Sequence, residues 1–197
     1  ANIDRPDKVL ECLGKTTRAS RHLLGLVNEV LDMARIESGR ISLAEEEFNL
    51  SELVDNLISM AKSEMDEHHH SLEVNIKNIE HEDVYVDTLR IQQVFMNLMS
   101  NSVKYTPDGG HIVFSIEERP NGQSELGCYV FSIEDDGIGM DEDFQKIMFQ
   151  PFTRADDNRT TKIQGTGLGM AITQNIVNMM NGNIQVDSVL NRGTKIT

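Results

Sequence analysis

The sequence predicts an α+β domain that follows a long helix. Apolar residues recur at helical spacing in four stretches. Shorter strand-like stretches follow the second, the third and the fourth of these. Together these elements have the layer pattern of an α+β fold. With 197 residues, 39% of them hydrophobic, the chain is long enough to bury a core in one or two domains.

The first helix has apolar and small residues at alternating spacings of three and four, the pattern of a coiled-coil or helix-bundle seam. The seam positions are Leu10, Leu13, Thr17, Ser20, Leu24, Val27, Leu31 and Ala34. Ser38-Gly39 is a typical helix end. Because one helix cannot bury such a seam alone, we expect a partner helix from another subunit or from a further part of the protein.

The region after this helix begins with a linker, which we place at residues 40–50. Ser51 is expected to cap the second helix, whose apolar residues keep the helical period up to Met65. Residues 72–77 and 84–86 are then predicted to be strands.

The middle of the chain holds a third helix followed by a strand pair. The helix bears Asn97 and Asn101 and is expected to end at residues 106–110, which have the composition of a turn. Residues 111–118 and 128–134 read as two strands joined by a polar segment.

The last part of the chain starts with a charged, irregular connection at residues 140–166. A connection of this length in a compact domain is more often functional than idle. A helix at residues 167–181 and strands at 184–187 and 194–197 complete the pattern.

Charge and cysteine content exclude some classes of protein. Eighteen Lys and Arg against 32 Asp and Glu give a formal charge of −14, which argues against general nucleic-acid binding. Cys12 and Cys128 have no CxxC spacing, so reduced thiols are expected. No signal-like amino terminus or run of 18 apolar residues is present, so we expect a soluble chain. Its start at Ala1 and its strand-like end at Thr194-Lys195-Ile196-Thr197 lead us to expect a segment of something longer.

Polar residues on the third helix form a stripe of their own. At about 100° per residue, Asn97, Asn101 and Lys104 share one face, with Tyr105 beside it. Asn is a poor residue for a helix interior, and its carbonyl oxygen is a ligand for hard divalent cations. The stripe indicates either a site for a metal-bound polyphosphate or an ordinary solvated face.

Two glycine clusters carry the next signal. The cluster Asp135-Asp136-Gly137-Ile138-Gly139 follows a strand, where the carboxylate could accept from a ligand amine. The cluster Gly165-Thr166-Gly167-Leu168-Gly169 opens a helix, where free N–H groups favour phosphate. Either cluster alone could be a turn, and neither fits the dinucleotide fingerprint or the P-loop.

In this order and spacing, the N-x-x-x-N, D-x-G-x-G and G-x-G-x-G motifs resemble the ATP-binding domain of sensor histidine kinases. That domain belongs to the superfamily of gyrase, heat-shock chaperone, histidine kinase and mismatch-repair ATPases. Phe149-Gln150-Pro151-Phe152 matches the kinases' phenylalanine box, and residues 31–39 look like the end of the second helix of their dimerisation domain.

The resemblance implies a domain plan. The fold would be a two-layer α/β sandwich of the Bergerat type, a mixed sheet with helices on one face. Residues 1–39 would be part of a dimerisation and histidine-phosphotransfer bundle, residues 40–50 a linker, and residues 51–197 the ATP-binding domain with a lid at about 140–166.

The resemblance also implies a role for each motif residue, with ATP and Mg²⁺ as cofactors. Asn101 would be the Mg²⁺ ligand and Asn97 its companion, Lys104 would touch phosphate and Tyr105 would pack on adenine. Asp135 would accept from the adenine amino group. The remaining nucleotide-binding positions would be Gly137, Gly139, Arg154, Arg159, Gly165, Thr166, Gly167, Leu168 and Gly169, with Lys162 a weaker candidate.

The implied function is presentation of the ATP γ-phosphate to a histidine. The kinases' box around the acceptor histidine is not found in this sequence, so we expect the acceptor helix elsewhere in the full-length kinase, upstream of Ala1. This segment alone is then expected not to phosphorylate itself. A response regulator would be the downstream partner. The apolar seam of the first helix also allows a homodimer through the bundle helix.

Two other functions stay open. A hydrolysing ATPase of the chaperone or mismatch-repair type would need a Glu where Asn97 stands, because an amide cannot take a proton from water. A degenerate nucleotide-binding scaffold would act through its bundle helix. The expected location is the cytoplasm, as part of a parent protein that could be anchored in a membrane.

Overall fold

The computed structural model describes residues 5–120, 127–155 and 165–197. It divides into two compact units, Ala1–Ile41 and Ser42–Thr197, and each is described by itself. Within the described ranges, no helix is long and apolar enough to cross a membrane.

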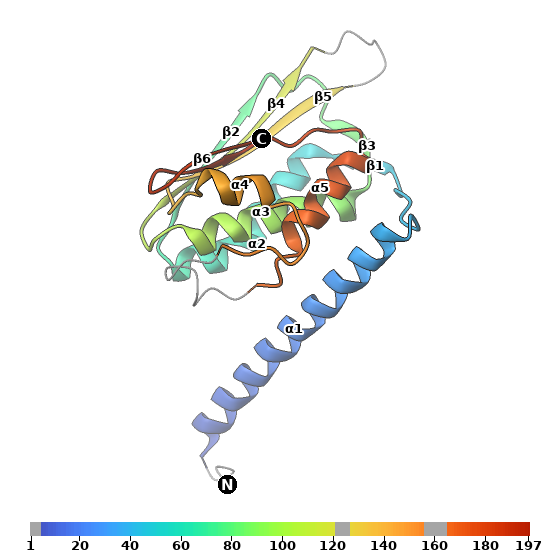
Figure 1. The fold of residues 1–197 in the computed structure, drawn as a ribbon. Coiled ribbons are helices and arrows are strands. Elements are labelled where there is room, and N and C mark those ends of the chain that lie inside the picture. The colour runs from blue at the N-terminus through green and yellow to red at the C-terminus, as the bar shows by residue number, and fades with distance from the viewer. Residues whose placement is uncertain (1–4, 121–126, 156–164) are drawn as a thin grey trace. The chain divides into compact units, whose positions relative to one another are not determined.

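The first unit consists of helix α1, Pro6–Glu37 (Figure 1). The helix ends where the sequence predicts: the N–H of Ser38 donates to the carbonyl of Ala34, and Gly39 follows with φ of 64°. Seam residues are exposed, with Leu10 69% and Leu24 63% accessible. The helix therefore leaves its apolar seam uncovered, as its sequence pattern indicates.

The second unit begins with a strand in the segment predicted to be a linker. Strand β1, Glu46–Asn49, pairs antiparallel with β3, Asp83–Val86, to form a separate two-stranded sheet. The strand has no alternation of apolar and polar residues, so its sequence carried no strand signal. Its pairing with a segment more than thirty residues away is a tertiary feature.

Helix α2, Leu50–Glu67, starts one residue before the predicted cap. The N-cap is Asn49, whose side-chain oxygen accepts from the backbone N–H of Ser51 at 2.9 Å. The prediction of Ser51 as the cap was wrong, because Asn49, two residues earlier and the last residue of β1, supplies the capping oxygen.

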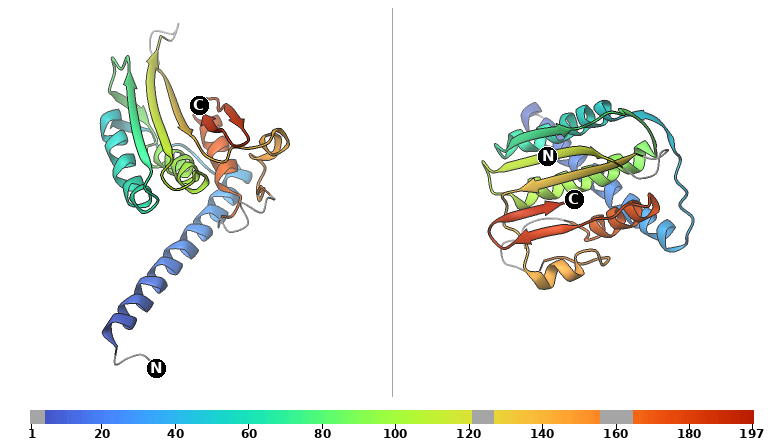
Figure 2. Two further views of the ribbon diagram at one scale, coloured as in Figure 1. Left: turned by 90° about the vertical axis from the view of Figure 1, so that its left-hand side faces the viewer. Right: turned by 90° about the horizontal axis from the view of Figure 1, so that it is seen from above.

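The main sheet has five strands in the order β2-β4-β5-β7-β6. Only the β2–β4 pair is parallel, so the sheet is mixed. Helices α2, α3 and α5 lie on one face of this sheet (Figure 2). The predicted α+β architecture, a mixed sheet with helices on one face, is confirmed. The bounds are Ser71–Lys77 (β2), Thr88–Tyr105 (α3), His111–Arg119 (β4), Cys128–Asp135 (β5), Gly169–Met179 (α5), Val186–Val189 (β6) and Gly193–Ile196 (β7).

The connection predicted to be irregular contains a short helix. Helix α4, Glu142–Ile147, is capped by Asp141, whose carboxylate accepts from the N–H of Phe144 at 2.7 Å. Six residues are too few to show a helical period, which is why the sequence pattern missed it.

The core forms where α3 packs on the central strands. The ring of Phe95 meets Phe114 of β4 at 5.7 Å and Phe131 of β5 at 4.7 Å between centroids. On β4, alternate residues Ile112, Phe114 and Ile116 are buried, as expected for a strand with one face on the core. This packing places the end of α3 beside the end of β5.

We predict that Asn49→Ala lowers the free energy of unfolding by about 1 kcal/mol, because the first turn of α2 loses its capping acceptor. The matched variant Ser51→Ala should change it by less than about 0.5 kcal/mol, since its hydroxyl makes only an exposed 3.3 Å bond to Glu82. Urea unfolding followed by circular dichroism measures both. Equal losses in the two variants would contradict the assignment of Asn49 as the cap.

Candidate nucleotide site

Asp135 is a buried carboxylate at the end of β5, only 9% exposed. Its Oδ2 accepts from the hydroxyl of Ser102 at 2.9 Å and its Oδ1 from the N–H of Gly137 at 3.1 Å. Burial raises the pKa of Asp135, while the hydrogen bonds from Ser102 and from the backbone of Gly137 and Thr194 oppose that rise. The carboxylate of Asp135 is thus a buried hydrogen-bond acceptor.

The glycines after Asp135 are required by close approach of other backbone. A Cβ on Gly137 would lie 2.6 Å from the carbonyl oxygen of Tyr105 and 2.7 Å from Asp135 Oδ1. Gly139 has φ of 63°, and a Cβ there would come within 2.7 Å of the carbonyl carbon of Val189. Only glycine fits both places, so this turn is more than a flexible link.

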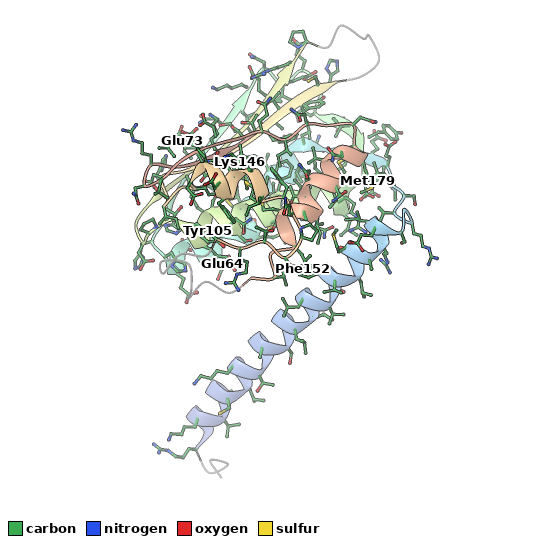
Figure 3. All side chains as sticks on the ribbon, viewed as in Figure 1. Glu64, Glu73, Tyr105, Lys146, Phe152 and Met179 are labelled. Carbon is green, nitrogen blue, oxygen red and sulfur yellow. The ribbon has the colours of Figure 1, made fainter. Side chains whose placement is uncertain are left out.

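The turn is also bonded to the end of α3. The N–H of Ile138 donates to the carbonyl of Tyr105 at 3.0 Å, and Asp136 accepts from the N–H of His111 at 2.8 Å. Tyr105, labelled in Figure 3, is half-buried, and burial raises its pKa while the charge of Arg154 opposes the rise. The predicted residues Tyr105, Asp135 and Gly137 are therefore neighbours.

The two amides of the α3 stripe face the start of α5. Asn97 Nδ2 donates to Thr173 Oγ1 at 2.8 Å, and Asn101 Nδ2 donates to the sulfur of Met170 at 3.3 Å. A Cβ on Gly169 would lie 2.8 Å from Asn97 Cγ, so α5 packs directly on this amide. The solvated-face alternative for the stripe is wrong for Asn97 and Asn101, which are half-buried between two helices.

The side-chain oxygens of these two amides are suitable ligands for a hard cation. Because the Nδ2 atoms of Asn97 and Asn101 are used as donors to α5, their Oδ1 atoms remain as acceptors. Amide oxygens are ligands that Mg²⁺ takes. The residues present are thus compatible with the metal that the family resemblance implies.

The second glycine cluster leads into α5. Gly167 has φ of 73°, Leu168 is fully buried, and the N–H of Leu168 donates to Thr166 Oγ1 at 3.1 Å. Helix α5 begins at Gly169 and its first turn has no side-chain cap. The first N–H groups of a helix have no partner within it, and the dipole there favours an anion.

The described ends of the predicted lid lie together. A Cβ on Gly167 would come within 2.7 Å of the carbonyl oxygen of Thr153 and 2.8 Å of the carbonyl carbon of Phe152. Phe152 has φ of 63° and is 70% exposed (Figure 3). This contact joins a described part of the predicted lid to the second glycine cluster.

Of the four predicted cationic residues, the structure describes Lys104 and Arg154. Lys104 is exposed in the last turn of α3, and Arg154 is exposed near Tyr105. Arg159 and Lys162 lie outside the described residues. Gly165 is exposed, with nothing within 4 Å of a Cβ placed on it.

Three residues at this site were missed by the sequence reasoning. Ser102 was not among the predicted site residues, yet its hydroxyl holds Asp135. Thr173, 1% exposed on α5, orients Asn97. Thr106 was read only as a turn residue, and it lies next to Gly137. The available signal was a hydroxyl on an otherwise apolar helix face, which is visible for Ser102 and Thr173.

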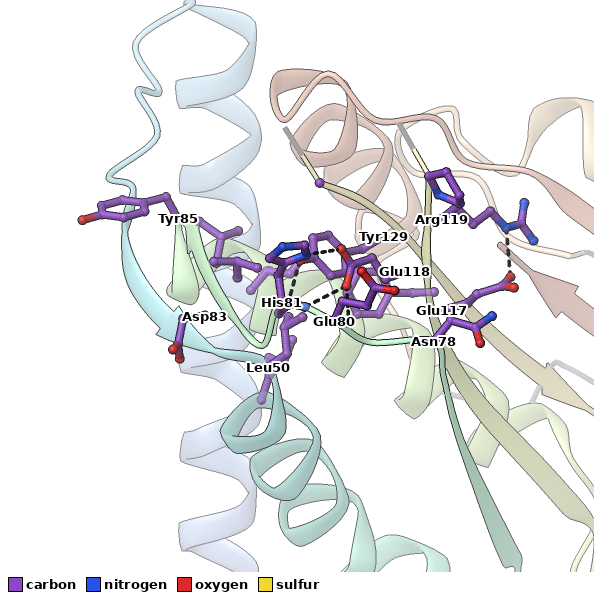
Figure 4. A pocket seen from close by; sticks show the side chains of 17 residues that line it. Leu50, Asn78, Glu80, His81, Asp83, Tyr85, Glu117, Glu118, Arg119 and Tyr129 are labelled. Atoms are coloured by element: carbon purple, nitrogen blue, oxygen red, sulfur yellow. Dashed lines mark hydrogen bonds and ion pairs between the residues drawn. The ribbon is translucent and has the colours of Figure 1, made fainter. Parts of the chain in front are cut away.

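A separate cavity of about 990 Å³ lies at the opposite ends of β4 and β5 (Figure 4). Its lining includes the pair His81–Glu118, with Nδ1 and Oε1 2.6 Å apart, and Tyr129, whose hydroxyl donates to the carbonyl of His81. Glu118 raises the pKa of His81 through this hydrogen bond and its charge. Among the described residues predicted to bind nucleotide, none lines this cavity.

Comparison with known proteins connects these motifs to a family. A sequence model described as "Histidine kinase-, DNA gyrase B-, and HSP90-like ATPase" matches residues 86–197. The signal transduction histidine-protein kinase BarA of Escherichia coli (strain K12) is 35% identical over 182 residues, which cover 92% of this chain and 20% of BarA. This chain thus spans about a fifth of that relative's length.

Solved structures share the fold. Full-length ShkA in complex with AMPPNP superposes with a TM-score of 0.76 at 24% identity, over 91% of this chain and 35% of ShkA. The histidine kinase ThkA, solved with the response regulator protein TrrA, has a TM-score of 0.68 at 21% identity, over 99% of this chain and 52% of that one. At these identities the likeness establishes the architecture.

We predict that Gly169→Ala destabilises the domain by about 1–3 kcal/mol, because the added methyl group would overlap the amide of Asn97. Gly165→Ala is the matched control in the same motif and should stay within about 0.5 kcal/mol of wild type, since its surroundings are open. Urea unfolding reports both values. A stability of Gly169→Ala equal to that of Gly165→Ala would rule out the close contact between α5 and Asn97.

Proposed function

Because the chain belongs to the family of histidine kinase-, DNA gyrase B- and HSP90-like ATPases and is homologous to sensor histidine kinases, we propose a specific role for it within that family. It binds Mg-ATP and presents the γ-phosphate for transfer to a histidine outside this segment. The observation that carries the proposal is the buried carboxylate of Asp135, held by Ser102 beside the amide stripe of the same helix. Residues 51–197 are assigned to this activity, and residues 1–39 to part of the phosphotransfer bundle.

The base of the nucleotide binds at the end of β5. The carboxylate of Asp135 accepts from an exocyclic amine, which selects adenine over guanine because guanine has a carbonyl oxygen at that position. Tyr105, whose backbone carbonyl accepts from Ile138 in the turn after Asp135, is the proposed packing surface for the purine. Gly137 and Gly139 let the turn after β5 pack closely on Tyr105 and Val189, which holds Asp135 in place for the base.

The phosphates bind between α3 and the start of α5. Asn101 is the proposed ligand of Mg²⁺, with Asn97 as its companion, and the metal when bound would neutralise phosphate charge. Gly167, Leu168 and Gly169 are proposed to lie against the phosphates, and the uncapped first turn of α5 offers N–H donors to phosphate oxygens. Lys104, Arg154 and Arg159 are the proposed cationic contacts, with Lys162 a weaker one.

Transfer to a histidine is favoured over hydrolysis by the chemistry of Asn97. A hydrolysing site needs a base that takes a proton from water, and an amide cannot do so. The Nδ2 of Asn97 is moreover occupied by Thr173, which holds the amide in place. The third alternative, a scaffold without nucleotide, is disfavoured by the close packing of both glycine motifs.

The partners follow from the same proposal. The acceptor is a histidine-phosphotransfer helix of the full-length kinase, and the exposed seam of α1 fits a homodimer through a helix bundle. A response regulator is the downstream partner, by analogy with ThkA and TrrA. The proposed ATP chemistry favours a cytoplasmic location for this part of the protein, within a parent that can be membrane-anchored.

We expect isothermal titration calorimetry to detect ATP binding to the wild-type chain in the presence of Mg²⁺. Asp135→Ala and Asn101→Ala should each weaken it at least about 10-fold, through loss of a charged hydrogen bond and of a metal ligand. The exposed α2 residues Asp55 and Asn56, each changed to Ala, are matched controls that should leave affinity unchanged. Absence of binding by wild type would favour the scaffold.

A second experiment separates transfer from hydrolysis. We expect the chain with γ-labelled ATP and the isolated phosphotransfer bundle of its parent protein to label the bundle, with a label that is stable to base and labile to acid. The chain alone should retain no label and release ADP only at background rate. Label on the chain alone would contradict the missing acceptor, and steady ADP release without the bundle would identify an ATPase.

A further inference from the structure

The separate cavity at the far ends of β4 and β5 is large enough for a small organic ligand. Its volume of about 990 Å³ lies at the upper end of the range for small-molecule sites, about 300–1,000 Å³. Strand β3, the first turns of α2 and α3, and the ends of β4 and β5 supply lining residues (Figure 4). The cavity is thus formed by the same domain as the nucleotide site, but from other residues.

The apolar part of the lining belongs to the core of the domain. Leu50 and Leu53 are buried, and the ring of Phe131 packs on Phe95 with 4.7 Å between centroids. The apolar lining residues are Leu50, Leu53, Val84, Val86, Ile91 and Phe131. Because the core holds these side chains, the apolar surface exists before a ligand arrives.

The polar part of the lining is held together by the carboxylate of Glu118. Its Oε2 accepts from the backbone N–H groups of Glu80 and His81 at 2.6 and 2.9 Å, and its Oε1 lies 2.6 Å from His81 Nδ1. The hydroxyl of Tyr129 donates to the carbonyl of His81 at 2.8 Å. The hydroxyl of Tyr129 is therefore used within the chain, and its half-buried ring is the part that can contact a ligand.

Two of the four acids that line the cavity have a basic partner. Glu117 accepts from Arg119 Nε at 2.9 Å. Glu118 pairs with His81 and raises the pKa of that imidazole, through the hydrogen bond and through its charge. Each of these pairs is close to neutral when the histidine is protonated.

The other two acids, Glu80 and Asp83, have no such balance among the described residues. Asp83 Oδ1 accepts from the uncharged amide of Asn49 at 2.8 Å. The structure gives the carboxylate of Glu80 no hydrogen bond or ion pair with a described residue. The lining therefore has an excess of negative charge next to an apolar and aromatic surface.

We propose that this cavity is a second ligand site and that it binds a small organic cation with an apolar body. Glu80 and Asp83 attract the cationic group, which also gains from a position over an aromatic ring such as that of Tyr129. The aliphatic lining takes the apolar body, and the excess negative charge disfavours anions. This inference goes beyond the proposed function, because the ligand is neither nucleotide nor metal.

Benzyltrimethylammonium is the probe for the test, because its positive charge does not depend on pH. Titrated into the ¹⁵N-labelled wild-type chain, it should shift the backbone amides of His81, Glu118 and Tyr129 to saturation. Uncharged benzyl alcohol and anionic benzoate carry the same ring without the cation. Each should bind at least about 10-fold more weakly at the same amides.

Two matched variants test the source of the attraction. Glu80→Gln removes one negative charge and keeps the backbone N–H that Glu118 binds, so it should weaken probe binding about 3- to 10-fold and leave benzyl alcohol unchanged. Glu52→Gln removes the same charge from an exposed α2 residue outside the lining, and its affinity for the probe should stay within about 2-fold of wild type.

Absence of saturating shifts at the lining residues would overturn the proposal, as would equal affinity for the probe and benzyl alcohol. Equal losses in Glu80→Gln and Glu52→Gln would also overturn it, because the net charge of −14 and not the lining would then attract the cation. Displacement of the probe by ATP with Mg²⁺ would place the probe in the nucleotide site, which contradicts a separate cavity.

Discussion

The hydrogen bond from Ser102 to Asp135 is the interaction on which the arrangement of the site depends. A buried carboxylate is costly unless donors surround it, and here a helix hydroxyl and the backbone of the following turn supply them. The bond joins α3 to β5 at the point where the glycine turn begins. It therefore sets the position of the carboxylate relative to the residues at the end of α3.

The packing of α3 makes that bond geometrically possible. The ring of Phe95 contacts Phe114 of β4 and Phe131 of β5. These contacts fix α3 on the face of the sheet that the helices cover. The same helix turns Asn97 and Asn101 toward α5 and ends at Tyr105 and Thr106. One helix thus contributes to the metal, phosphate and base parts of the proposed site, and its rigidity keeps their spacing.

Close backbone approach explains why glycine recurs at the site. At Gly137 and Gly139 the obstacle to a side chain is the backbone of α3's end and of β6, and at Gly169 it is the amide of Asn97. These obstacles belong to two elements, α3 and β6. The glycine clusters therefore work as packing surfaces, and the motif spacing reflects which elements must touch.

Much of the fold was predictable from local patterns, because α2, α3, α5 and the paired strands β4 and β5 each carry a clear period. The sequence pattern did not identify β1, which lacks alternation and pairs with a distant strand, or α4, which is too short to show a period. It also named the wrong cap for α2, where two residues separated by Leu50, Asn49 and Ser51, both had capping side chains.

By itself the sequence determined the class of fold, the order of the motifs and the candidate residues on α3 and in the glycine clusters, because these depend on residue type and local spacing. Only the tertiary structure decided that Ser102 holds Asp135, that Thr173 orients Asn97, and that Glu118 pairs with His81 in the lining of a separate cavity. The reason is physical: hydrogen-bond partners and burial are set by which elements pack together, and no local period records that.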